Sequence, residues 1–177
     1  ELSLGPVKAK MKETLQEAAA TIEQLRRVAL TTSEATLTDL MAGSFMGGMT
    51  LEKQFELHDK LINALQEIGA SSDQIENVEA GWRKGVTLIY HRAIRRAVEE
   101  REHPNKINTE ATAEQKAAGK ELQDLLDFEN WSVPTPHQIR TVIGKYNIDS
   151  KEVERWIDDY DHFLRNNEIR NREEFFK

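Results

Sequence analysis

Residues 5–29 read GPVKAKMKETLQEAAATIEQLRRVA, and this stretch decides the fold of the chain. Pro6 suits the first turn of a helix, because its fixed φ is helical and no amide donor is needed there. Apolar residues then recur at every third or fourth position, which is the spacing of one face of an α-helix. The sequence therefore predicts a long first helix that extends to about residue 41.

The apolar stripe of this helix has two interpretations. One is a coiled-coil seam of about three heptads, in which Leu15, Ile22 and Leu25 contact a partner. The other is one face of an intramolecular bundle. The second is favoured because alanine, at Ala18 and Ala29, contributes little to a seam.

The same periodicity continues along the chain and predicts five further helices. They cover about residues 50–68, 71–102, 112–128, 136–146 and 150–164. Three of them begin at a Ser or Thr that is followed three residues later by Gln, the pattern of a capping box, at Ser71, Thr112 and Thr135. The predicted fold class is therefore all-α, a bundle of about six helices with a long N-terminal helix.

The polar segment 103–111, which contains Pro104, is the best candidate for a domain boundary. It divides the chain into a long-helix bundle, residues 1–102, and a smaller three-helix module, residues 112–177. One continuous domain is the alternative. Residues 165–177 are mostly polar, and we expect this end to fray.

Two further groups of apolar residues are candidates for a partner surface. Residues 43–49 read GSFMGGM, so we expect the first helix to end there in a loop that carries Phe45, Met46 and Met49. The loop either folds into the core or meets a partner. The C-terminal part holds several aromatic residues, which either dock onto the first three helices or form a partner groove. The candidates among them are Trp131, Trp156, Tyr160 and Phe163.

Composition argues against several classes of function. The 177 residues carry a net charge of −7, which opposes binding to nucleic acid. The basic group Arg92, Arg95, Arg96 and Arg101 is compensated by neighbouring glutamates. The sequence has no Cys, which excludes disulfides and thiolate metal sites. We expect no cofactor, no metal site and no catalytic residue.

The alternative hypothesis, that the protein is an enzyme, depends on its histidines. Glu100 and His103 have the Glu-x-x-His spacing of di-iron bundles, but they lie among charges at a helix end. His58 and Asp59 are adjacent, so they point about 100° apart on a helix and are not expected to form a dyad. A helical effector enzyme, either a nuclease or a metal-dependent hydrolase, would require His58, His91 and His103 to converge.

Residues 2–9, Leu-Ser-Leu-Gly-Pro-Val-Lys-Ala, resemble a junction of uncharacterised bacterial membrane-anchored proteins. In those proteins a hydrophobic anchor leads through a Leu-Gly-Pro-x-Lys-Ala segment into a cytosolic helix. The resemblance implies a cytoplasmic domain that is tethered to the inner membrane by an anchor preceding Glu1. It implies no activity, and membrane contact would come only from that preceding segment.

The sequence therefore predicts a non-enzymatic helical interaction or scaffold domain. Its partner would be another protein or a second copy of the chain, and neither a nucleic acid nor a cofactor is expected. The contacts would come from the stripe of the first helix, the loop at 43–49 and the C-terminal aromatic residues.

Overall fold

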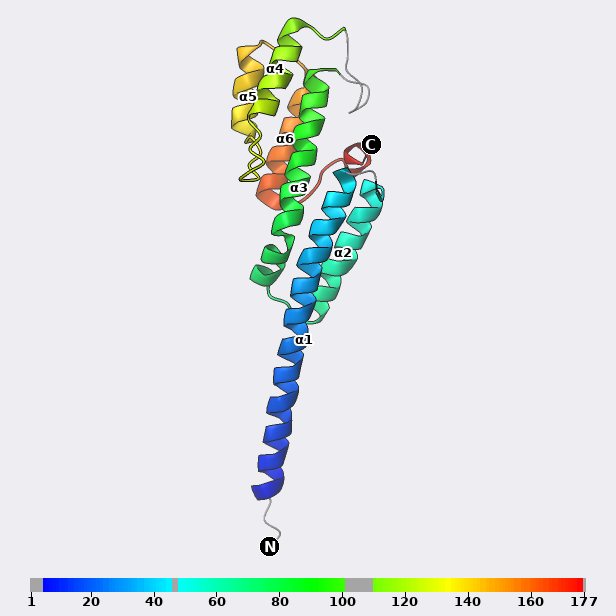
Figure 1. Ribbon diagram of the computed structural model, residues 1–177, viewed down its shortest axis with the longest axis vertical. Coiled ribbons are helices and arrows are strands. Elements are labelled where there is room, and N and C mark those ends of the chain that lie inside the picture. The colour runs from blue at the N-terminus through cyan, green and yellow to red at the C-terminus, as the bar shows by residue number, and fades with distance from the viewer. Residues whose placement is uncertain (1–4, 46–47, 101–109, 177) are drawn as a thin grey trace. The chain divides into compact units, whose positions relative to one another are not determined.

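The computed structural model describes residues 5–45, 48–100 and 110–176. Within these ranges the chain forms seven helices and no strand, so the predicted all-α class is confirmed (Figure 1). The helices are α1 (Gly5–Phe45), α2 (Leu51–Glu67), α3 (Ser72–Val98), α4 (Ala113–Asp124), α5 (Pro136–Lys145), α6 (Lys151–Asn166) and α7 (Arg172–Phe175).

The chain divides into two compact units, residues 1–81 and 82–177. The division falls inside α3, whereas the sequence pointed to the polar segment 103–111. The physical reason is that α3 serves two cores. Its first ten residues belong with α1 and α2, while its remaining turns supply Tyr90 and His91 to the core built with α4, α6 and α7.

In the first unit, α1 and α2 form a hairpin in which the second helix is much shorter. With 41 residues α1 is about 60 Å long, while the 17 residues of α2 span only about 25 Å. The end of α2 meets α1 at Arg26, whose Nε donates a hydrogen bond of 3.0 Å to the carbonyl oxygen of Ile68. The N-terminal half of α1 therefore extends beyond the end of α2 (Figure 1).

The turn after α2 requires a glycine. Gly69 has φ +79°, a left-handed conformation that closes the helix end, and its amide donates to the carbonyl oxygen of Gln66 at 2.9 Å. A Cβ atom at Gly69 would lie 3.1 Å from Nη2 of Arg26. Backbone conformation and close approach thus both favour glycine at this position.

The core of the second unit is centred on Tyr90 of α3. Its ring stacks on Tyr160 at 5.6 Å between centroids and lies 5.7 Å from Phe163 and 4.8 Å from Phe175. Trp156 meets the same ring edge-on at 6.3 Å. Because aromatic rings bury large areas, this cluster holds α3, α6 and α7 together.

The sequence predicted the starts of three helices correctly, but it misplaced the end of the first helix and the start of fraying at the C-terminus. The capping boxes at Ser71, Thr112 and Thr135 are all present. The first helix ends within the expected segment 43–49, but it continues through Gly43 to Phe45, four residues past the expected end at about residue 41. The expected fraying after residue 165 is also wrong in part, because buried Ile169 and Phe175 dock this end onto the core.

None of the helices in the described ranges is both long and apolar enough to span a membrane.

Candidate interaction site

The exposed half of α1 carries the most unusual surface of the first unit. Six large apolar side chains there are each 57–66% exposed, and we call this surface the α1 stripe: Val7, Met11, Leu15, Ile22, Leu25 and Val28. The interpretation that an intramolecular bundle covers the stripe is wrong for these residues. The end of α2 meets α1 at Arg26 and leaves the turns before it uncovered, while Val28 lies on a face of α1 that α2 does not cover.

The face that α2 covers farther along the same helix is rotated away from the α1 stripe. Ser33, Leu37 and Met41, which lie four residues apart, are buried on the C-terminal half of α1. The stripe follows the spacing 11, 15, 18, 22, 25, 29, which runs almost parallel to the helix axis at 3.5 residues per turn. The contact with α2 farther along α1 therefore does not extend onto the α1 stripe, which is exposed.

The loop between α1 and α2 contributes less than expected. Met49 is 45% exposed, while Met46 and the side chain of Phe45 lie outside the described residues. Met49 lines a hollow of about 270 Å³ together with Asp39, Leu40 and Gln54. Gln54 is 1% exposed, and its Nε2 donates to the carbonyl oxygen of Met49 at 2.8 Å, which fixes the start of α2.

Three of the four predicted aromatic contact residues are not on the surface. Trp156, Tyr160 and Phe163 are buried around Tyr90, so the hypothesis that they form a partner groove is wrong. The physical reason is the strong amphipathicity of α6, whose apolar face lies in the core of the second unit. Burial in this cluster also raises the pKa of Tyr160 to about 12.

Trp131 is the exception, and the structure gives it an exposed neighbour. Trp131 and Phe128 are each 55% exposed in the turn that follows α4. Asp127 holds this turn, accepting hydrogen bonds from the backbone amides of Glu129 and Asn130 at 3.0 Å. Hydrogen bonds from Asn130 and then Glu129 lower the pKa of Asp127. Sequence reasoning missed Phe128 because the residue was placed inside the fourth helix, which in fact ends at Asp124.

His58 meets two carboxylates in the first unit. Its Nε2 lies 2.8 Å from Oε1 of buried Glu79, and its Nδ1 lies 3.0 Å from Oδ1 of Asp59. The prediction that His58 and Asp59 do not meet is therefore wrong, because side-chain rotation closes the angle between neighbouring helical positions. Sequence reasoning missed Glu79, which lies 21 residues away in another helix. The arrangement links α2 to α3 and supports a structural role.

His91 is buried in the second unit, where its Nε2 lies 2.9 Å from the carbonyl oxygen of Leu122. Burial lowers the pKa of His91 to about 4, so the ring is neutral at physiological pH and joins α3 to α4. His103 lies outside the described residues. Among the residues that the structure describes, no three His, Asp or Glu side chains are grouped so that they could hold a metal ion.

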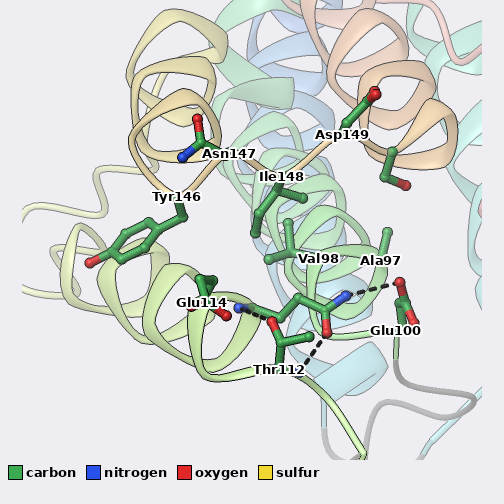
Figure 2. A pocket seen from close by; sticks show the side chains of 11 residues that line it. Ala97, Val98, Glu100, Thr112, Glu114, Tyr146, Asn147, Ile148 and Asp149 are labelled. Atoms are coloured by element: carbon green, nitrogen blue, oxygen red, sulfur yellow. Dashed lines mark hydrogen bonds between the residues drawn. The ribbon is translucent and has the colours of Figure 1, made fainter.

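A cavity of about 360 Å³ in the second unit is lined by the end of α3, the start of α4 and the turn before α6 (Figure 2). Gln115 closes one side: its Nε2 donates to Oε1 of Glu100 at 2.9 Å, and its Oε1 accepts the amide of Thr112 at 2.8 Å. Glu114 and Asp149 add two more carboxylates to the lining. The hydrogen bond between Gln115 and Thr112 belongs to the capping box of α4, and the one to Glu100 ties the start of α4 to the end of α3, so Gln115 has a structural role here.

No model of a known protein family matches this chain, and no curated protein or solved structure matches it either.

Proposed function

We propose that this chain is a non-enzymatic interaction module that binds another helix through the α1 stripe. The observation that supports the proposal is the exposure of six large apolar side chains on one side of α1. Single exposed apolar residues are ordinary on protein surfaces, but a contiguous row is typical of a contact site. Helical periodicity makes this row a surface suited to a second helix.

A partner helix would also add to the stability of α1 itself. About 20 residues of α1 extend beyond α2 and gain nothing from packing against it, although most of the stability of helices in proteins comes from such packing. Covering the stripe with a partner helix would supply that packing. The contact would therefore order this half of α1 as well as bury its apolar side chains.

The double substitution Leu15→Glu with Leu25→Glu tests the proposal. It puts two charges into the centre of the α1 stripe, so any assembly through this surface should weaken at least tenfold, which corresponds to about 1.4 kcal/mol. Multi-angle light scattering over a range of concentrations would then give the 20.3 kDa of a single chain for the variant and a larger mass for the wild type.

A matched control adds the same two charges to the opposite side of α1, by Gln16→Glu with Ala20→Glu. Both residues are exposed and lie outside the α1 stripe, so this control should assemble like the wild type. If the stripe variant keeps the larger mass of the wild type while circular dichroism shows intact helices, the chain assembles without the α1 stripe and the proposal is wrong.

The proposal also concerns location, which rests on the resemblance of residues 2–9 to anchored proteins. We propose a cytoplasmic module tethered to the inner membrane by a segment that precedes Glu1 in the full gene product. Fractionation of cells that express the full gene product tests this. Recovery in the membrane fraction after a high-salt wash is the expected result, and recovery in the soluble fraction would contradict the proposal.

A further inference from the structure

We infer that the partner of the α1 stripe is a second copy of this chain, aligned in parallel and in register over residues 11–29. The inference rests on the proposed function and adds the identity and direction of the partner. Three observations support it: the heptad register of the stripe, the charges beside it and the area that it would bury.

The register follows from the spacing of the apolar residues. Leu15 and Ile22 occupy a positions, Met11 and Leu25 occupy d positions, and the sequence fills the remaining layers with alanine at 18 and 29. Within a parallel coiled coil, a β-branched residue at a beside leucine at d favours two strands over three or four, and Ile22 with Leu25 has this arrangement. The preceding a position holds Lys8, which limits the seam to the turns after it.

The charged residues beside the seam favour a parallel over an antiparallel pair of α1 helices. The charged e positions are Lys12 and Arg26. In an antiparallel pair, e positions face each other, so Lys12 of each copy would approach Arg26 of the other. In a parallel pair, e positions face g positions, where the sequence has Val7 and Thr21. The parallel arrangement thus avoids two contacts between like charges, each unfavourable by a few tenths of a kcal/mol.

The area of the α1 stripe is sufficient for a weak dimer. Covering the five large apolar side chains of the α1 stripe that follow Lys8 would bury on the order of 500 Å² on each copy, or about 1,000 Å² in total. That value lies at the lower limit for a specific interface. Because alanine fills two of the six layers, we expect association in the micromolar range rather than a permanent dimer.

Disulfide trapping tests the direction, and the absence of Cys from the sequence makes single-Cys variants unambiguous. Ala18→Cys places a thiol in a d layer, where two parallel copies bring it against itself. The matched control Ala20→Cys places a thiol on the opposite side of the same helix. In a glutathione redox buffer at about 100 µM protein, we expect the Ala18→Cys chain to form a disulfide-linked dimer at least tenfold faster than the control.

A mixture of the Met11→Cys and Ala29→Cys chains tests the antiparallel alternative. Antiparallel copies would join these two positions in a mixed disulfide, whereas parallel copies would give the two symmetric products, and mass spectrometry separates them. A dimeric mass in light scattering with the mixed disulfide dominant would overturn the inference and leave the proposed function standing. A single-chain mass at every concentration, with equal rates for the Ala18→Cys and Ala20→Cys chains, would also overturn the inference and would leave a helix of another protein as the partner in the proposed function.

Discussion

At the residue scale, Tyr90 shows how the second core is held. Its ring contacts four aromatic side chains, but its buried hydroxyl has no hydrogen-bond partner within the described part of the chain. Burial and the charge of Asp159 raise the pKa of Tyr90, so this hydroxyl stays protonated. The contribution of Tyr90 to the stability of the second unit therefore comes from its aromatic ring and not from its hydroxyl.

Two substitutions at Tyr90 separate the contribution of the ring from that of the hydroxyl. Tyr90→Phe removes an unpaired polar group and should leave the free energy of unfolding unchanged or raise it by about 1 kcal/mol. Tyr90→Ala should lower it by about 3–5 kcal/mol, because it opens a cavity in the aromatic cluster. Urea unfolding followed by circular dichroism measures both. Equal losses for the two variants would show that the hydroxyl has an essential partner.

His91 predicts how the stability of the second unit depends on pH. The pKa of the folded-state ring is about 4, below the 6.5 of an exposed histidine. Between these values the unfolded chain binds a proton that the folded chain does not, so the free energy of unfolding falls as pH decreases from about 6.5 to about 4. The total loss is on the order of 3 kcal/mol.

His91→Gln removes this titration and should flatten the pH dependence over the same range, measured by urea unfolding at a series of pH values. His137 is exposed on α5 and serves as the matched control, so His137→Gln should keep the slope of the wild type. If the free energy of unfolding of His91→Gln still falls with decreasing pH as in the wild type, another titrating group causes the pH dependence.

At the scale of the element, the turn between α2 and α3 depends on Gly69. Gly69→Ala requires a left-handed alanine whose Cβ approaches Arg26, and it should lower the free energy of unfolding by about 1 kcal/mol. Gly144→Ala is the control, because it lies in α5 with no neighbour within 4 Å and should be neutral or stabilising through helix propensity. Thermal unfolding compares the two, and equal melting temperatures would contradict the role of Gly69.

Elements were the most predictable part of this structure. Local signals such as the box at Thr135 and Gln138 involve residues three apart, so the sequence contains all the information they need. The end of α1 was harder, because one glycine at 43 is tolerated within a helix that packs on α2. Long-range pairs such as His58 with Glu79 leave no local pattern, and they could not be predicted.

At the scale of the whole molecule, the sequence predicted the fold class but not which apolar surfaces would be covered. Periodicity shows that Leu15 and Leu25 share one face of a helix, yet the same is true of Trp156 and Phe163, which are buried. Whether such a face is buried depends on which other part of the chain packs against it. The face of α6 meets Tyr90, which lies more than 60 residues earlier, whereas the stripe of α1 extends past the end of α2.

Hydrogen exchange of the backbone amides of residues 7–28, measured at protein concentrations from about 1 to about 500 µM, tests the central claim most directly. A half-helix that is stabilised by a second copy should exchange slowly at high concentration and at least tenfold faster after dilution, and Leu15→Glu with Leu25→Glu should exchange fast throughout. Exchange that is equally slow at every concentration, in both the wild type and the variant, would contradict the claim that the α1 stripe pairs with another helix.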